Sequence, residues 1–365
     1  MSVGGPIISN LGLLSELVEQ DCSVKVLTTN RNGLQRMKIK HKVKNGININ
    51  YFPSFWNHRF SIKLLVNIIR EIKRHDIVHV DDVFSFYTIT ALLINIILKK
   101  KFVFSPRGTL ISYVFKKEQY FKRLVKILFL KILVFFIRKQ SKFAFHFTSN
   151  KEKNEAERIL SVFNLGKQKS LIVPNGFKLN SKMKEKKIIL KDVIKIVTLG
   201  RINRKKRLEL AILAIKCLIK KGYKVQYNII GNDDDGSIIE LKNLIRKLQL
   251  KKHVFFHKPI FTNLKFKFLK RHNIFLLTSK SENFGNVVLE ALSVQLPIVL
   301  TNNLPWEILR DTSIGTITKS SPISISEGIA LQMTKNYRCK DFESFIKKFD
   351  WTLLSKKFLK EIREF

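Results

Sequence analysis

Residues Ile274–Thr301 read IFLLTSKSENFGNVVLEALSVQLPIVLT and contain three successive elements. Ile274–Thr278 and Ile298–Thr301 are short apolar runs typical of buried strands, and Val287–Ser293 has the apolar spacing of a helix. A strand, a helix and a strand joined by short connections form the unit from which parallel sheets are built. The stretch therefore predicts an α/β fold, with its polar loop at the carboxyl end of a strand.

The same alternation continues on both sides of this stretch. Further strands of the same series are expected at Ile194–Leu199, Val225–Ile230 and Val254–His257, with helices at Leu208–Lys221 and Ile238–Leu248. An N-terminal series is expected to contain strands at Ser23–Thr28, Ile77–Val80, Phe102–Ser105, Phe143–Thr148 and Ser170–Val173, with helices at Leu11–Glu19, Ile62–Arg74 and Thr88–Leu98. The pattern predicts two doubly wound domains, over residues 1–180 and 193–345, and a C-terminal amphipathic helix over residues 346–365. The polar, basic segment Leu179–Asp192 is expected to link them.

The composition is that of a globular protein with a large excess of positive charge. Of the 365 residues 45% are hydrophobic, which excludes disorder over most of the chain, and 68 Lys and Arg against 28 Asp and Glu give a net charge of +40. Such a charge favours nucleic acid, anionic lipid or phosphorylated small molecules as partners, although a general lysine bias explains it equally well. Three scattered cysteines, and the lack of a signal peptide or long apolar run, predict a cytoplasmic protein.

Two glutamates flank the turn into the predicted helix of the opening stretch. Glu282 lies in the loop, residues Asn283, Phe284, Gly285 and Asn286 form the turn, and Glu290 lies one helical turn later. Backbone N–H groups at a helix start suit a phosphate or a sugar oxygen, and two carboxylates can accept hydrogen bonds from hydroxyls of one elongated ligand. The alternative is structural: Glu282 caps the helix and Glu290 is a surface residue.

Two further loops carry phosphate-binding chemistry. Leu199–Leu208, LGRINRKKRL, places Arg201 and Lys206 between a strand and a helix, where they suit a diphosphate or belong to the general lysine excess. Gly4–Gly5 precedes the helix Leu11–Glu19 and resembles a weak phosphate loop.

These motifs resemble those of the family 4 retaining glycosyltransferases, which have the GT-B fold. Glu282 and Glu290 match the Glu-x7-Glu motif of that family, and Gly200, Arg201 and Lys206 match its Gly-Arg-x4-Lys pattern. The segments SPRGTL, FTSNKE and VPNG are also similar to segments of the family. The resemblance implies two facing Rossmann-like domains, with the C-terminal helix crossing back to the N-terminal domain.

The resemblance also implies roles for these residues. Glu282 would contact the transferred sugar, and Glu290 the ribose of the nucleotide. Arg201 and Lys206 would stabilise the departing diphosphate. The turn residues Asn283, Phe284, Gly285 and Asn286 would hold the sugar and the diphosphate, and Gly5 would touch the donor phosphates.

The sequence departs from the family at three places. A strand precedes the Gly-Gly loop in the family, but only Met1–Val3 stand before it here, so we expect the natural start to lie upstream. Arg107 stands where many members have histidine, and we place it in the cleft without assigning it as a base. His79, beside two aspartates, is either a cleft residue or a buried structural histidine.

The expected activity is transfer of a sugar, with retention, from a nucleotide-diphosphate sugar to a glycan or lipid-linked glycan in capsule or lipopolysaccharide assembly. No cofactor or metal is expected, because Asp233–Asp235 has the position of a loop cap. The alternatives are a nucleotide-sugar epimerase of the same fold and a basic nucleic-acid-binding protein; the latter lacks clustered stacking aromatics.

The segment Lys116–Lys139 mixes lysine and arginine with phenylalanine, leucine and isoleucine. It is typical either of a helix that lies on an anionic membrane or of a buried helix whose lysines reach the surface. We expect the protein to be peripheral at the inner face of the cell membrane, through its basic charge and a lipid-linked acceptor.

Overall fold

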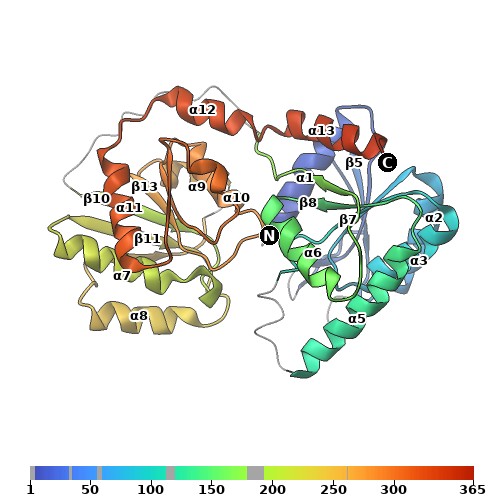
Figure 1. Ribbon diagram of the computed structural model, residues 1–365, viewed down its shortest axis with the longest axis horizontal. Helices are drawn as coiled ribbons and strands as arrows, with labels where there is room; N and C mark the ends of the chain where they lie inside the picture. Colours follow the sequence, from blue (N-terminus) through green and yellow to red (C-terminus); the bar gives the residue numbers. More distant parts are fainter. Residues whose placement is uncertain (1–4, 33–34, 56–59, 112–119, 179–192, 261) are drawn as a thin grey trace. The chain divides into compact units, whose positions relative to one another are not determined.

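The computed structural model describes residues 5–32, 35–55, 60–111, 120–178, 193–260 and 262–365 (Figure 1). The chain divides into two compact units. Unit 1 comprises Met1–Gly176 and Trp351–Phe365, and unit 2 comprises Phe177–Asp350. The expected linker, Leu179–Asp192, lies outside the described residues.

Unit 2 is built around a sheet of six parallel strands in the order β12-β11-β10-β13-β14-β15. The strands are β10 (Ile194–Leu199), β11 (Val225–Ile230), β12 (Val254–His257), β13 (Ile274–Leu277), β14 (Ile298–Thr301) and β15 (Gly315–Thr318). Every residue of β13 and β14 is buried, which is why these strands are apolar without alternation.

Helices cover both faces of this sheet (Figure 1). One face packs on α7 (Leu208–Lys220), α8 (Ser237–Lys247) and α11 (Pro322–Thr334). The other packs on α9 (Thr262–Leu269), α10 (Asn286–Leu292) and α12 (Cys339–Lys347). Two short 3₁₀ turns, η1 (Arg204–Lys206) and η2 (Glu307–Leu309), lie in loops. The doubly wound architecture predicted for this part is confirmed.

Unit 1 contains two larger sheets, whose strands are not paired with each other in the described residues. The order β1-β5-β4 joins β1 (Lys25–Thr29), β5 (Ile47–Phe52) and β4 (His41–Lys44), and the order β6-β7-β8-β9 joins β6 (Ile77–Asp81), β7 (Lys101–Ser105), β8 (Phe143–Phe147) and β9 (Ser170–Ile172). The helices are α1 (Gly5–Val18), α2 (Ile62–Arg74), α3 (Phe86–Leu98), α5 (Tyr120–Arg138), α6 (Asn150–Ser161) and α13 (Trp351–Arg363); two-residue strands β2 (Arg31–Asn32) and β3 (Gln35–Arg36) form a small ladder.

The β4–β5 hairpin was not predicted from the sequence. Its turn is Asn45–Gly46, with φ values of 51° and 73°, and this dipeptide is a strong hairpin signal. The strand residues before it, HKVK, are all exposed, so they lack the apolar run by which the other strands were recognised.

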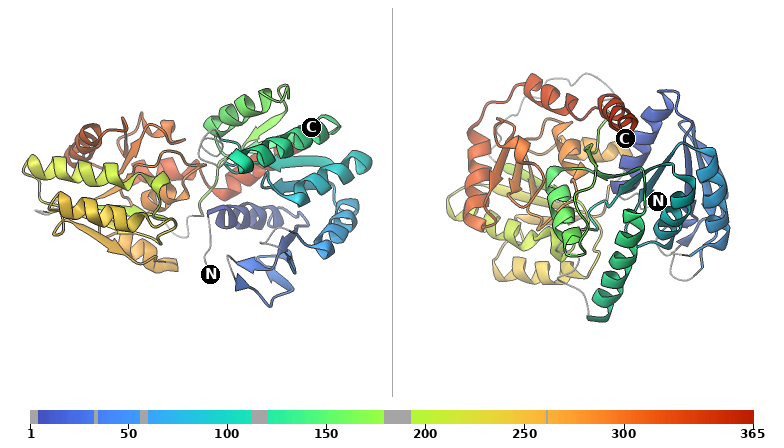
Figure 2. Two further views of the ribbon diagram at one scale, coloured as in Figure 1. Left: turned by 90° about the horizontal axis from the view of Figure 1, so that it is seen from below. Right: turned by 45° about the vertical axis from the view of Figure 1, so that its right-hand side comes forward.

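The two faces of the β6–β9 sheet pack on different helices. Phe102 and Phe104 of β7 belong to a core with α2, α3, α5 and α6, whereas Val103 belongs to a core with α1 and α13. Helix α13 lies beside α1 (Figure 2) and crosses it at Gly12, where a Cβ atom would lie 2.1 Å from Nε1 of Trp351. Glycine at this position therefore allows the close packing of the C-terminal helix on unit 1.

Helix α1 starts six residues earlier than the apolar pattern predicted. Pro6 is compatible with the first turn of a helix, and Ser9 Oγ donates a 3.0 Å hydrogen bond to the carbonyl oxygen of Gly5. The prediction of a Gly4–Gly5 loop ahead of the helix is therefore wrong for Gly5, which is the first helical residue; Gly4 is outside the described residues.

Gly231 follows β11 and lies against the loop that follows β10. A Cβ atom at this position would be 1.8 Å from the carbonyl oxygen of Gly200, which is backbone and cannot rotate away. We expect Gly231→Ala to lower the free energy of unfolding of unit 2 by about 2 kcal/mol or more, because the two loops must separate. Urea unfolding followed by circular dichroism measures this.

Gly166→Ala is the matched control, since no atom lies within 4 Å of the place that its Cβ atom would take. We expect Gly166→Ala to leave the unfolding midpoint nearly unchanged. Equal midpoints for the two variants would contradict the close approach of the loops at Gly231.

Candidate functional site

The strand order of unit 2 reverses direction between β10 and β13. From β10 the chain moves outward through β11 to β12 and then returns to β13 on the other side of β10. Loops leaving neighbouring strands at such a point diverge, and the crevice between them is where open α/β sheets bind ligands. The loop after β10 contains Arg201 and Lys206, and the loop after β13 contains Glu282.

These two loops are fastened to each other by hydrogen bonds. The hydroxyl of Thr278 donates to the carbonyl oxygens of Lys206 and Arg207, at 2.9 and 3.0 Å. The backbone N–H of Lys280 donates to the carbonyl oxygen of Lys205 at 2.8 Å. The cationic loop is therefore held in a defined place beside the glutamate loop.

Lys206 and Glu282 form an ion pair in this crevice. Nζ of Lys206 is 2.7 Å from Oε1 of Glu282, the hydroxyl of Ser279 donates to the same oxygen at 2.7 Å, and the two charged side chains are only 14% and 16% exposed. Burial opposes ionisation of Glu282, but the charge and hydrogen bond of Lys206 and the bond from Ser279 outweigh it and hold the pKa below its usual value. Glu282 is therefore a hydrogen-bond acceptor at neutral pH.

Glu290 also has a lysine partner. It lies on α10, is 8% exposed, and its Oε1 is 2.7 Å from Nζ of Lys265 on α9. Burial raises the pKa of the Glu290 carboxyl, and the charge and hydrogen bond of Lys265 act against this rise. Neither structural alternative holds: Glu290 is not a surface residue, and the N-cap position of α10 is Gly285, not Glu282.

The turn between the glutamates is held by aromatic packing. Phe284 is buried, its ring centroid is 4.8 Å from that of Trp306, and its carbonyl oxygen accepts a 2.6 Å hydrogen bond from the indole N–H of Trp306. The side chain of Phe284 therefore belongs to the core and cannot itself contact a donor. Gly285 has φ = 86°, a left-handed conformation that glycine adopts without strain. Asn283 and Asn286 are half-buried on either side.

Arg201 follows β10 as predicted, but its side chain is not part of the buried ion pair. It is 73% exposed and forms a 3.1 Å ion pair with Asp234. Asp235 accepts a hydrogen bond from the backbone N–H of Arg204, so this acidic run joins the loops that follow β10 and β11. No cluster of three metal-ligating side chains occurs within the ranges that the structure describes.

Arg107 and His79 lie in unit 1: Arg107 follows the carboxyl end of β7, and His79 is the middle residue of β6. Nε of Arg107 donates to Asp81 at 2.9 Å, and its two terminal nitrogens donate to Asn175 and Asn10, at 3.1 and 2.5 Å. This network ties the ends of β6 and β7 to α1 and to the loop after β9. The side chain of Arg107 is 7% exposed, and its placement in the cleft stays a prediction.

His79 is packed against aromatic neighbours. Its Nε2 is 3.4 Å from Nδ1 of His146, and its ring centroid is 5.7 Å from that of Phe358 on α13. Burial lowers the pKa of His79 below its ordinary value, although Asp81 acts in the opposite direction. These contacts favour the buried structural histidine over the cleft residue.

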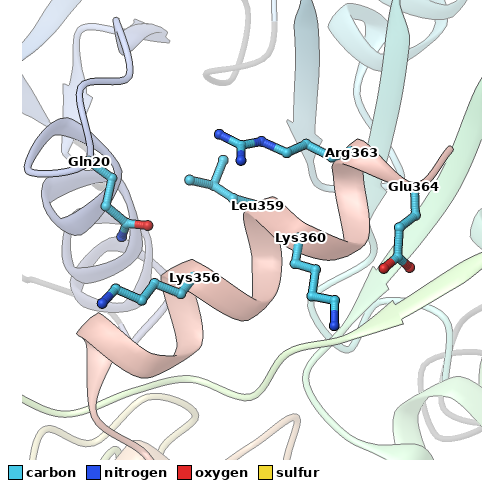
Figure 3. Close-up of a pocket in the computed structure, with 6 residues that line it drawn as sticks. All are labelled: Gln20, Lys356, Leu359, Lys360, Arg363 and Glu364. Atoms are coloured by element: carbon cyan, nitrogen blue, oxygen red, sulfur yellow. The ribbon is translucent and has the colours of Figure 1, made fainter.

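One depression of about 340 Å³ lies between α1 and α13 (Figure 3). Its lining consists of one residue that follows α1, Gln20, and five residues of α13 and its C-terminal end: Lys356, Leu359, Lys360, Arg363 and Glu364. No predicted site residue lines it, and four of its six side chains are long and charged. It is therefore not the candidate site, which remains the crevice between β10 and β13.

Two residues of this site were missed in the sequence. Ser279 stands three residues before Glu282 within the quoted stretch, so its place in the same loop was a usable signal. Lys265 gave no signal, because it is one lysine among many and reaches Glu290 only through the packing of α9 on α10.

The comparisons with known proteins agree with this geometry. The chain is 29% identical over 265 residues to the uncharacterized glycosyltransferase MJ1059 of Methanocaldococcus jannaschii, a match that covers 67% of this chain and 60% of that protein. It is 31% identical over 129 residues to the capsular polysaccharide biosynthesis glycosyltransferase CapM of Staphylococcus aureus, covering 34% of this chain and 32% of that protein. The chain thus spans less than two thirds of the length of these curated relatives.

A solved structure, Anabaena Alr3699/HepE in complex with UDP-glucose, superposes with a TM-score of 0.74 at 13% identity and covers 100% of this chain and 97% of its own. This likeness confirms the predicted GT-B fold of two Rossmann-like domains. Two family models match: "Glycosyltransferase Family 4" over residues 3–181 and "Glycosyl transferases group 1" over residues 180–349. From these matches, and from the paired glutamates and the cationic loop of unit 2, we conclude that the chain belongs to family 4 of the glycosyltransferases.

Proposed function

We propose that the protein transfers a sugar from a nucleotide-diphosphate sugar to a hydroxyl group of a glycan or lipid-linked glycan, with retention of anomeric configuration. The observation that carries the proposal is the buried Lys206–Glu282 ion pair in the crevice between β10 and β13. Burying two charges carries a desolvation cost that apolar side chains at the same positions would avoid. An ion pair at the ligand-binding edge of the sheet therefore favours a functional role over a purely structural one.

The chemistry of the pair suits a glycosyl diphosphate. The carboxylate of Glu282 can accept hydrogen bonds from sugar hydroxyls, and the ammonium group of Lys206 can bind a diphosphate oxygen. As the bond between the anomeric carbon and the diphosphate breaks, negative charge grows on the leaving oxygen, and Lys206 stabilises that charge. The exposed guanidinium of Arg201 would add a second cation when it exchanges Asp234 for phosphate.

In the proposed reaction the acceptor oxygen bonds to the anomeric carbon on the face that the diphosphate leaves. The proton of the acceptor hydroxyl passes to the departing diphosphate oxygen, so no protein base is needed. Glu290 would bind the ribose, and the backbone of residues 283–286 would lie along the sugar and diphosphate. The crystal structure of Anabaena HepE with UDP-glucose supports a donor of this class.

The proposed place of the reaction is the assembly of a cell-surface polysaccharide at the inner face of the membrane. The similarity to CapM, a protein named for capsular polysaccharide biosynthesis, supports this proposal. Calorimetric titration with a panel of uridine and guanosine diphosphate sugars, followed by product analysis with glycan acceptors, tests it. Donor turnover without any acceptor would instead favour an epimerase.

Glu282→Gln removes the charge of the sugar-contacting carboxyl while keeping its size. We expect kcat to fall at least about 100-fold, with affinity for the sugar-free nucleoside diphosphate changed by less than about threefold. Lys206→Met should weaken diphosphate binding as well as turnover. Steady-state kinetics and calorimetry measure both, and circular dichroism checks folding.

Glu240→Gln is the control for Glu282→Gln, because Glu240 pairs with Arg204 of the same cationic loop but is exposed. Its turnover should equal that of the wild type. Wild-type turnover in Glu282→Gln would refute the proposed role of the ion pair.

Lys265→Met tests the second lysine–glutamate pair. Removing the positive charge next to Glu290 lets burial raise the pKa of that carboxyl further, so it takes up a proton at a higher pH than in the wild type. A protonated carboxyl is a weaker acceptor for ribose hydroxyls. Between about pH 7.5 and about pH 5.5 we expect nucleotide affinity to fall about tenfold more in this variant than in the wild type.

Lys267→Met, an exposed lysine on the same helix, is the matched control and should retain the wild-type pH profile. Calorimetric titration with the nucleoside diphosphate at each pH gives the affinities. Parallel profiles for Lys265→Met and the wild type would show that Glu290 does not depend on Lys265 or does not bind the nucleotide.

A further inference from the structure

Helix α5 of unit 1 exposes large apolar side chains on its outer face. The five exposed apolar residues are Leu124, Val125, Leu128, Ile132 and Phe135. The exposed fractions of Leu128 and Phe135 are the largest, at 60% and 57%. Leu124 and Val125 are adjacent, and Leu128, Ile132 and Phe135 follow at three- or four-residue spacing. The five therefore form a stripe along the helix, opposite the buried Leu130, Leu133 and Ile137. The sequence alternative of a buried helix with only its lysines at the surface is therefore wrong.

The stripe continues over two neighbouring helices. Helix α3 packs on α2 at one side and on α5 at the other, and all three bury their inner faces in one core (Figure 1). Their outer faces therefore form one surface, which we call the outer helix face. On α3 it presents Phe86, Leu93 and Ile97, the last 78% exposed, and on α2 it presents Ile62, Val66 and Ile69.

The charges of the outer helix face are of one sign. Helix α3 has no charged residue, and α5 has five basic residues and no acidic one. Helix α2 has four basic residues, and its only acid, Glu71, is buried and paired with Lys25 at 2.8 Å. Most of the basic residues lie toward the ends of the two helices, whereas Lys126 and Lys131 lie in the middle of α5.

This combination is unfavourable in water and favourable at a lipid surface. A helix that faces water normally carries charged residues outward, and a contiguous exposed apolar surface marks an interaction site. Apolar side chains can enter the acyl boundary while flanking lysines and arginines contact anionic headgroups. No helix of the described residues is long and apolar enough to cross the bilayer.

We propose that the outer helix face of α2, α3 and α5 docks the protein on a bilayer that contains anionic lipid. Its apolar centre supplies the area removed from water, and its basic ends select negatively charged headgroups. A link between this docking and a lipid-linked acceptor rests on the proposed function. The docking itself is tested without donor or acceptor, so its failure leaves the transferase proposal untouched, and the reverse also holds.

Vesicle co-sedimentation of the full chain tests the apolar part of the proposal. We expect binding to vesicles of phosphatidylcholine mixed with phosphatidylglycerol and much weaker binding to phosphatidylcholine alone. The triple variant Ile97→Ser, Leu128→Ser, Phe135→Ser should bind the mixed vesicles at least about tenfold more weakly. The single variant Leu128→Ser should show a smaller loss in the same direction, with unchanged circular dichroism.

The matched control is Ile239→Ser, Ile323→Ser, Leu331→Ser, three exposed apolar residues of unit 2. This control should bind as the wild type does. Equal loss in the two triple variants, or no binding by the wild type, would overturn the proposal.

A charge-matched pair of variants tests the basic part. Lys122→Gln, Arg123→Gln, Lys131→Gln removes three exposed charges from α5, and Lys242→Gln, Lys247→Gln, Lys251→Gln removes three from unit 2. We expect only the first to weaken binding to the mixed vesicles. Equal effects would mean that the net charge of +40 alone attracts the protein, and this would overturn the assignment to the outer helix face.

Hydrogen exchange measured by mass spectrometry locates the contact. On binding, peptides from residues 62–74, 86–98 and 120–138 should become protected, and peptides from α7 and α8 should not. Sedimentation of the protein without vesicles gives the last test. If the wild type is a dimer and the triple variant at Ile97, Leu128 and Phe135 is a monomer, a second copy of the chain covers this face. That result would overturn the proposal.

Discussion

The candidate site depends on the close approach of two backbone loops at the point where the sheet of unit 2 reverses direction. The carbonyl oxygen of Gly200 lies where a Cβ atom of residue 231 would be. Because Gly231 has no Cβ atom, the loops after β11 and β10 can approach each other. The hydroxyl of Thr278 then fastens the loop after β10 to the end of β13. The outcome is that Lys206 is held beside Glu282 at the carboxyl ends of β10 and β13.

The two glutamates have different environments although they belong to one short motif. Glu282 has a lysine and a serine partner, and its pKa is held low; Glu290 has only a lysine, and burial raises its pKa. One carboxyl is therefore fixed as an acceptor, while the other is closer to taking up a proton. In both cases the carboxylate already has a lysine ammonium group at 2.7 Å.

The two units use their exposed surfaces differently. In unit 2 the cationic loop after β10 is largely compensated: Arg201, Arg204 and Lys206 each pair with a carboxylate. On the outer helix face of unit 1 the basic residues of α2 and α5 flank apolar side chains, and its only acid is buried. The positive charge of the chain is thus not a uniform background, and this difference separates the candidate site of unit 2 from the outer helix face of unit 1.

The local sequence determined most strands and helices, because buried parallel strands need apolar runs and the chain alternates them with helical patterns; β10, β11, β12 and β14 have the predicted bounds. It also determined which loops carry Glu282 and Lys206, since loops after strands of a parallel sheet share one edge, and it placed Glu290 in the helix that follows. Tertiary structure alone decided the partners. Lys265 reaches Glu290, and Arg107 pairs with Asp81, because packing brings together residues from separate elements. The exposure of the α3 and α5 apolar residues was likewise undecided until helix packing showed which side of each helix the core takes.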